Sequence, residues 1–292
     1  MQRIAPHLWF DTQAREAAEL YTSVFPDSRI KTVTTLHGTP SGDVDLVSLE
    51  IAGYEFALIS AGPLFKFNPS ISFLVSCETK DEVDRIWQEL SKDGKALMEL
   101  GAYPFSERYG WLQDRYGVPW QLMYGQMAKQ RITPTLMFTG AQAGRTEEAI
   151  NFYTSVFDDS SVGMIMRYGA GQEPETEGTI NYAQFRLEGQ TFAAMDSARP
   201  HGFAFNEAIS LLVHCDTQEE IDKYWTRLSA DPRAEQCGWL KDKFGVSWQV
   251  TPRAMETMLA GGDPKKIAAV TAAFLQMKKF DLRKLQEVYE AA

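Results

Sequence analysis

Two stretches of twelve residues decide the fold: GWLQDRYGVPWQ, which begins at Gly110, and GWLKDKFGVSWQ, which begins at Gly238. They share eight of twelve residues at a separation of 128 positions. Upstream of them, YTSVFPDS from Tyr21 returns as YTSVFDDS from Tyr153, with seven of eight residues identical. Matches that recur in the same order along a chain indicate an internal duplication. The sequence therefore predicts two related domains.

A third pair of segments extends the duplication and helps to set the predicted boundaries. FKFNPSISFLVSCET from Phe65 returns as FAFNEAISLLVHCDT from Phe203, with nine of fifteen residues identical. The largest difference in length lies before the Gly110 and Gly238 segments, where residues 91–109 of the first copy correspond to only nine residues of the second. The predicted domains are residues 1–128 and 129–254, followed by a helical extension over residues 255–292.

Each copy reads as two βαβββ modules, which makes the fold class α+β. Residues 4–10 form an apolar run, and apolar residues then recur at helical spacing over 14–25. Three further strands are predicted over residues 30–37, 45–51 and 54–60. A second module starts with a strand at 71–77 and the capping box Thr79-Lys-Asp-Glu82. After residue 252 the pattern is helical only, with an apolar face that we expect to dock on the protein's own body.

Charge and cysteine content exclude several classes of protein. Lysine plus arginine total 29 and aspartate plus glutamate total 39, which gives a net charge of −10 and argues against nucleic acid or anionic membrane as partners. Three cysteines, none in a C-x-x-C pair, argue against a disulfide framework and a structural zinc site. With no apolar leader and no run of 18 apolar residues, we expect a cytoplasmic protein.

The motifs IAPHLWF, AAELYTSVFPDSRI, FNPSISFLVSCET and GWLQDRYGVPWQL together resemble the PhnB-like branch of the glyoxalase/bleomycin-resistance superfamily, also called vicinal oxygen chelate proteins. Some members carry the label 3-demethylubiquinone-9 3-methyltransferase. The resemblance covers about residues 3–252. It implies tandem domains in which paired modules form a curved mixed sheet, with helices outside and a small ligand in the cup. It also implies that the two copies correspond to the two subunits of a homodimer formed by single-domain relatives. The protein would then be either a monomer with two dimer-like halves or itself a homodimer.

In catalytic members of that superfamily, a divalent metal is held by four side chains from the first and last strands of the modules. Because side chains alternate along a strand, the equivalent positions can be predicted here. The residues expected to face the cups are, in the first copy, His7, Trp9, Ser72, Leu74 and Gln121, with a fourth ligand position near Leu58 or Ser60, and, in the second copy, Thr135, Ser210 and Gln249, with a position near Ala194 or Asp196. One imidazole among neutral amides and hydroxyls is a poor donor set. No cofactor is therefore predicted, and a divalent metal is the disfavoured alternative.

The predicted function is the binding of a small organic molecule in the first cup, with the reaction left open. His7 is the candidate general base, because imidazole titrates near neutral pH, and Glu107 is the candidate acid. Glu107 belongs to the unmatched stretch 97–110, read as a long connection that brings Tyr103 and Phe105 over the ligand. The alternatives are a metal-dependent lyase or dioxygenase of the glyoxalase type and a sequestering protein without turnover. The sequence leaves open whether the chain is an enzyme.

Overall fold

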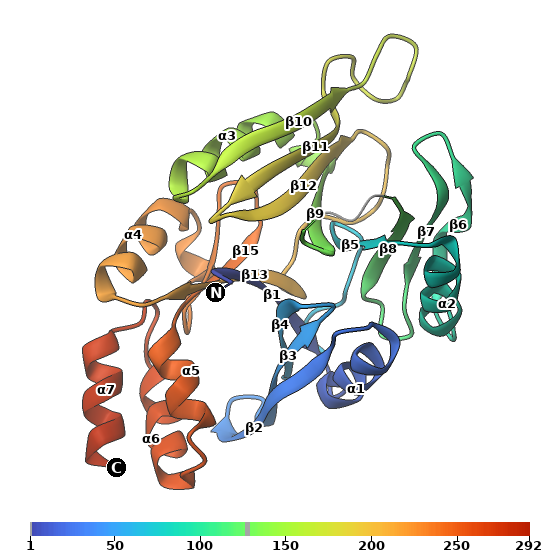
Figure 1. Cartoon of the computed structure of the whole chain (residues 1–292). Helices are drawn as coiled ribbons and strands as arrows, with labels where there is room; N and C mark the ends of the chain where they lie inside the picture. The colour runs from blue at the N-terminus through green and yellow to red at the C-terminus, as the bar shows by residue number, and fades with distance from the viewer. Residues whose placement is uncertain (1, 126–128) are drawn as a thin grey trace.

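The structure is a computed structural model that describes residues 2–125 and 129–292 (Figure 1). The first half contains β1 (Ile4–Phe10), α1 (Ala14–Val24), β2 (Arg29–Thr39), β3 (Gly42–Ile51), β4 (Tyr54–Ser60), β5 (Ile71–Cys77), α2 (Lys80–Leu90), β6 (Lys95–Tyr103), β7 (Ser106–Gln113) and β8 (Pro119–Tyr124). The second half contains β9 (Ile132–Thr139), α3 (Thr146–Val156), β10 (Ser161–Arg167), β11 (Ile180–Leu187), β12 (Gln190–Ser197), β13 (Ile209–Cys215), α4 (Gln218–Leu228), β14 (Trp239–Lys241) and β15 (Ser247–Pro252), with two short 3₁₀ turns at Gly140–Gln142 and Pro232–Ala234. The tail contains α5 (Arg253–Ala260), α6 (Pro264–Phe274) and α7 (Leu282–Ala291).

The predicted domain boundary at residue 128 falls on 126–128, outside the described residues.

The strands form two mixed sheets, which confirms the predicted α+β fold built from tandem modules. The modules that begin with β1, β5 and β9 are βαβββ, whereas the one that begins with β13 has only β14 and β15 after its helix. Sheet A has the order β14-β15-β13-β1-β4-β3-β2, and sheet B has the order β10-β11-β12-β9-β5-β8-β7-β6. Each sheet therefore combines one module from each half of the chain. The expectation that the two modules of one copy share a cup is wrong, because the first module pairs with the fourth and the second with the third.

The two halves meet through antiparallel pairs of first strands. In sheet A, β1 pairs with β13 and His7 lies opposite Ser210, while in sheet B, β5 pairs with β9 and Ser72 lies opposite Thr135. The other edge of β1 is occupied by β4 in parallel, and that of β5 by β8. Sequence pattern could not distinguish the two arrangements, because β5 (ISFLVSC) and β13 (ISLLVHC) present nearly the same side chains to a neighbour.

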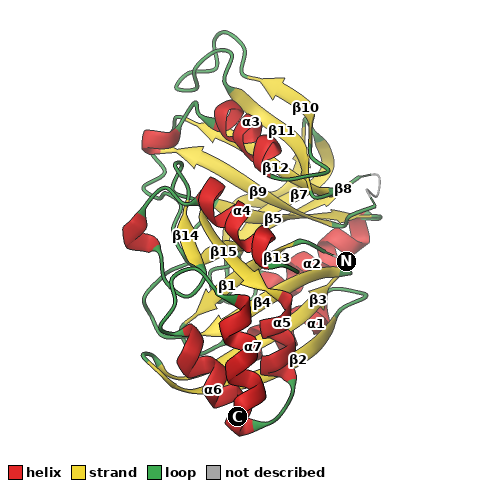
Figure 2. Ribbon diagram, turned by 90° about the vertical axis from the view of Figure 1, so that its left-hand side faces the viewer, coloured by secondary structure: helices red, strands yellow, loops and turns green. Residues whose placement is uncertain are grey.

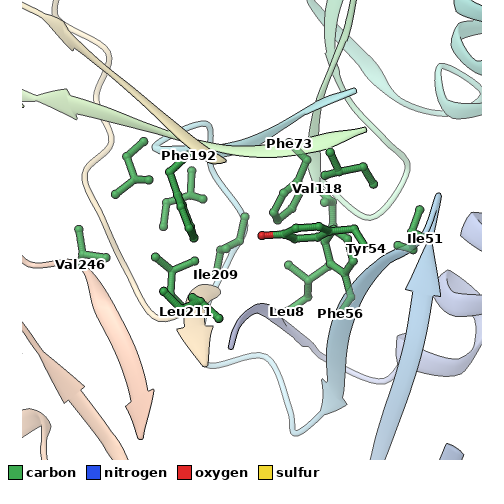
Figure 3. Close-up of a cluster of buried hydrophobic side chains, with 14 of the residues drawn as sticks. Leu8, Ile51, Tyr54, Phe56, Phe73, Val118, Phe192, Ile209, Leu211 and Val246 are labelled. Carbon is green, nitrogen blue, oxygen red and sulfur yellow. The ribbon is translucent and has the colours of Figure 1, made fainter. Parts of the chain in front are cut away.

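The main core lies between the two sheets. Figure 3 shows Phe73 and Phe192 of sheet B beside Leu8 and Leu211 of sheet A. Phe56 of sheet A meets Phe73 with ring centroids 5.1 Å apart. The helices α1 to α4 contribute their apolar sides to the same core. As a result, the opposite surface of each sheet points away from the core, and we call these surfaces face A and face B.

The longer segment of the first copy is a hairpin and not the long connection expected from the sequence. Residues 95–113 form β6 and β7, whereas the second copy has only the short strand β14. In the second copy the backbone N–H groups of Cys237 and Gly238 donate to the carbonyls of Met277 and Lys278, at 2.8 and 2.7 Å. The segment between α6 and α7 thus occupies the position beside β14 that β6 occupies beside β7.

The tail docks on the protein's own body, as expected. Leu36 and Val44 of sheet A form a buried apolar cluster with side chains of the three tail helices and of the segment between α6 and α7: Met255, Met258, Leu259, Val270, Phe274, Met277, Phe280 and Leu285. Figure 2 shows α5, α6 and α7 side by side against the part of sheet A that contains β1, β4 and β2. Asp263 and Asp281 cap α6 and α7 by accepting from backbone N–H groups. In the described part of the chain, none of the helices combines the length and the apolar character needed to cross a membrane.

Candidate functional site

The predicted site residues are divided between the two faces. Face A carries His7, Trp9, Ser210 and Gln249. His7 of β1 lies opposite Ser210 of β13. Leu212, two residues after Ser210 and therefore on the same face, lies opposite Gln249 of β15. Face B carries Ser72, Leu74, Gln121 and Thr135, because Ser72 lies opposite Thr135 and Leu74 opposite Gln121. The expectation that His7, Ser72 and Gln121 line one cup is therefore wrong. The pairing of modules across the two halves puts His7 in one sheet and the other two residues in the other sheet.

Face A is covered by the tail. Trp9 and Ile59 of this face pack against the cluster that the tail helices form. Gln249 Nε2 donates to Ser210 Oγ at 2.9 Å, and the ring of Trp239 meets His7 edge-on with centroids 5.4 Å apart. His214, from β13, has its Nδ1 2.6 Å from Glu256 Oε1 of α5, which ties the tail to the sheet.

His7 is held as a neutral imidazole. Its side chain is buried, with 4% relative exposure, and its Nδ1 has no hydrogen-bond partner in the described structure. Burial lowers the pKa of His7 to about 3. A general base that works near neutral pH needs a pKa close to that pH. Nothing in this environment adapts His7 to that task.

The buried imidazole predicts a loss of stability on acidification. Below pH 6.5 the unfolded chain takes up a proton at His7 that the folded protein does not take up until about pH 3. The free energy of unfolding should therefore fall as the pH decreases through this window, by about 1.4 kcal/mol per pH unit from this group. Urea unfolding should show this by comparison with His7→Thr, which copies Thr135 of the other half. Between pH 6 and pH 4 the free energy of unfolding of the wild type should fall by about 2.5 kcal/mol more than that of the variant. Parallel curves would contradict the prediction.

Face B holds a chain of hydrogen bonds from polar side chains. Tyr109 Oη donates to Gln121 Oε1 at 2.7 Å, and Gln121 Nε2 donates to Ser72 Oγ at 2.7 Å. Burial raises the pKa of Tyr109, so its hydroxyl remains protonated at neutral pH. The Nε1 of Trp111, which neighbours Gln121 across the strand pair, is a buried donor with no partner in the described structure. In this row the donors of Tyr109 and Gln121 are therefore already bonded, and the N–H of Trp111 is left without an acceptor among the described residues.

Around these polar groups, face B is unusually rich in methionine. Strand register places five of the chain's eleven methionines on this face, namely Met98, Met123, Met137, Met166 and Met195, and Met164 lies two residues before Met166 in β10. Tyr182 lies opposite Met166, and Trp111 opposite Met98. Met164 and Met166 are 51% and 50% exposed. Methionine side chains adapt their shape to varied apolar surfaces and are frequent at binding sites for diverse ligands.

The hairpin β6–β7 places two of the three residues predicted there at face B. The ring of Tyr103 stacks on that of Phe105 and meets Tyr109 edge-on, with centroids 5.6 and 5.5 Å apart. Glu107 is on the surface, with its side chain 74% exposed and its carboxylate 2.6 Å from Lys80 Nζ. The hydrogen bond and charge of Lys80 lower the pKa of Glu107, the opposite of what a general acid requires.

The methionines of face B were missed by sequence reasoning. The alternation of Met164 and Met166 within SVGMIMR was a visible signal of one exposed apolar strand face. What could not be seen was that β9 to β12 belong to the same sheet as β5 to β8. Without that pairing, the six methionines are scattered through both halves of the sequence.

The donor sets do not fit the divalent metal that the family resemblance implies. Beside His7 on face A lie Ala57, Ser210 and Gln249, and the corresponding positions on face B are neutral or apolar. The fourth ligand positions expected from the sequence are wrong: Leu58 lies in the core, Ser60 accepts from the N–H of Ala14, Ala194 lies in the core and Asp196 accepts from Thr146. Neutral amides and hydroxyls bind transition metals weakly. Among the described residues, no three histidine, cysteine or acidic side chains cluster as ligands.

Three solved structures are similar to this chain to different extents. A glyoxalase I mutant from Zea mays shares 11% identity with a TM-score of 0.53, covering 86% of this chain and 95% of that chain, a likeness of fold alone. A PhnB protein from Bacillus cereus shares 37% identity over 42% of this chain and 100% of that chain, with a TM-score of 0.40. Protein PA1353 from Pseudomonas aeruginosa shares 23% identity over 44% of this chain and 100% of that chain, with a TM-score of 0.38. No curated protein matches the chain.

The family model described as 3-demethylubiquinone-9 3-methyltransferase matches the chain twice, over residues 2–123 and 130–251. The two matches correspond to the two copies of the duplication, and together they span most of the chain. The chain therefore belongs to this family, and it contains the family's domain twice in tandem.

Proposed function

We propose that the protein binds a small, largely apolar organic molecule on face B. The observation that carries this proposal is the asymmetry of the two faces: the tail covers face A, whereas Met164, Met166 and Phe105 leave apolar side chains exposed on face B. Exposed apolar clusters on a folded protein commonly mark binding sites. The family description names a demethylubiquinone, and a quinone ring with an apolar side chain belongs to the proposed class of ligand.

Polar groups of face B would orient the ligand. Tyr109, Gln121 and Ser72 form a fixed hydrogen-bonded row, and the indole N–H of Trp111 has no partner in the described structure. A carbonyl or ether oxygen of the ligand would accept from that N–H. A few fixed polar groups within an apolar surface are the usual composition of a small-molecule site. The proposal is binding without a metal, and it treats His7 and Glu107 as having no part in it.

Nile red, a neutral apolar dye, provides the test. We expect it to bind the wild type and to bind the double variant Met164→Glu/Met166→Glu about thirtyfold more weakly, because each exposed methionine contributes on the order of 1 kcal/mol when a ligand covers it. Both residues are half exposed, so the variant should fold. Val33→Glu, an equal change at an exposed apolar residue of sheet A, is the matched control and should leave the affinity unchanged. Equal dye affinity in the double variant and the wild type would refute the proposal.

A further inference from the structure

We infer that the first half of the chain carries a second binding site, a groove that fits a small aromatic zwitterion such as an aromatic amino acid. The groove has a volume of about 520 Å³ and lies where the end of β1, the segment 63–67 and the turn 113–117 meet. Sites for small molecules commonly measure about 300 to 1,000 Å³. The groove includes none of the face B residues on which the proposed function depends.

Aromatic rings form the walls of the groove, and the backbone around them is fixed. Trp9, Phe65, Phe67 and Tyr116 line it. Trp9 meets Phe65 edge-on with centroids 5.1 Å apart, and Trp9 Nε1 donates to the carbonyl of Gly62 at 2.8 Å. The segment that carries the two phenylalanines is held by Asn206 Nδ2, which donates to the carbonyl of Lys66 at 2.9 Å. The walls are therefore in place before a ligand arrives, which lowers the entropic cost of binding.

Charges of both signs line the same groove. Lys66, Lys95 and Arg115 bring three cations, and Asp11 and Asp93 bring two carboxylates. Within the described part of the chain, none of these five forms an ion pair or a side-chain hydrogen bond with a protein group. Charges of opposite sign that do not neutralise one another beside aromatic walls match a ligand that carries a ring, a carboxylate and an ammonium group.

Asp114 also lies at the groove, but its oxygens are already occupied. Oδ1 accepts from the backbone N–H groups of Tyr116 and Val118, and Oδ2 accepts from Tyr21 Oη and Trp120 Nε1. This carboxylate is therefore part of the scaffold and leaves the recognition of a ligand to the other charges.

The second half of the chain lacks the equivalent site. Ala204 stands at the position of Lys66, and Lys243, at the position of Arg115, is 2.7 Å from the carboxylate of Glu148. In the first half the counterpart of Glu148 is Glu16, whose Oε1 accepts from Tyr116 Oη at 2.7 Å. That bond needs the hydroxyl of Tyr116, which Phe244 lacks. Duplication has thus left one copy with free charges and the other with paired ones.

Titration calorimetry with L-tryptophan tests the site. We expect L-tryptophan to bind the wild type, and L-tryptophanamide, which lacks the carboxylate, and N-acetyl-L-tryptophan, which lacks the ammonium, to bind at least fivefold more weakly. One charge-assisted contact at a partly exposed site accounts for a change of this size. Absence of L-tryptophan binding, or equal binding of either derivative, would overturn the proposal.

Two variants locate the binding. Lys66→Ala copies the second half, and Asp93→Asn keeps the shape of a residue whose φ of 57° asparagine tolerates. Each should weaken the binding of L-tryptophan at least fivefold, whereas Lys243→Ala, which removes a lysine side chain from the second half, should leave the binding unchanged. If both variants bind L-tryptophan like the wild type, or if Met166→Glu weakens it instead, the groove is not the site. Nile red binding to face B is a separate readout, so failure of one proposal leaves the other standing.

Discussion

Replacement of Asp114 by alanine is expected to lower the free energy of unfolding by about 4 kcal/mol. Its carboxylate accepts four hydrogen bonds, from Tyr21 Oη at 2.7 Å, Trp120 Nε1 at 3.0 Å, and the N–H groups of Tyr116 and Val118. Tyr21 and Trp120 are fully buried, so water cannot replace the lost acceptor. Each buried donor left without a partner costs about 1 to 3 kcal/mol.

Urea unfolding measures this loss, and the duplication supplies the controls. Tyr21→Phe removes one donor and leaves the acceptor with three, so we expect a loss of only about 1 kcal/mol. Asp242, in the second half, accepts the same set of bonds from Tyr153, Trp248, Phe244 and Val246. Asp242→Ala should therefore cost about as much as Asp114→Ala. A loss below about 1 kcal/mol for either aspartate would show that the four bonds contribute little.

Deletion of residues 253–292 is expected to abolish the native state. The tail supplies most of a buried apolar cluster, and its removal would expose Leu36, Val44 and Trp9 of face A together. It would also remove the backbone bonds that Cys237 and Gly238 make to the segment between α6 and α7. Domains of this kind have total stabilities of about 5 to 15 kcal/mol, less than the burial of so many large side chains contributes. Gel filtration should show aggregates, and near-ultraviolet circular dichroism should lose its native signal.

A point substitution keeps this prediction testable if the truncated chain cannot be purified. Phe280 is 2% exposed and packs against Phe274, so Phe280→Ala should cost about 3 kcal/mol in urea unfolding. Phe105→Ala makes the same chemical change at a residue that is 59% exposed and should cost less than about 0.5 kcal/mol. A truncated protein that stays monomeric with native circular dichroism would show that the tail is dispensable.

Local sequence patterns predicted the elements of this fold well. The strands 4–10, 54–60 and 71–77 and the cap residue Thr79 have the positions that alternation and capping chemistry indicate. The helical pattern expected after residue 252 corresponds to α5, α6 and α7, and Asp263 and Asp281 cap the last two. These features depend on neighbours within a few residues, which a single sequence displays directly.

Pairing between distant strands could not be predicted in the same way. The apolar strand β1 accepts either β5 or β13 as a neighbour with the same alternation of side chains. The choice of β13 separates His7 from Gln121 and gathers the methionines of face B. Strand parity therefore separated His7, Ser72 and Gln121 from the core side of their strands, but the expected positions at Leu58 and Ala194 lie in the core, and parity could not show which residues share a face.

The pairing of β1 with β13 has a consequence for synthesis of the protein on the ribosome. While the first half emerges, β1 and β5 each have one edge without its native neighbour, and β13 and β9 are translated later. Free strand edges favour association between chains. Sheet A gains its last strand only at Pro252, and the tail that covers it follows. We therefore expect nascent chains to depend on chaperones until translation is nearly complete.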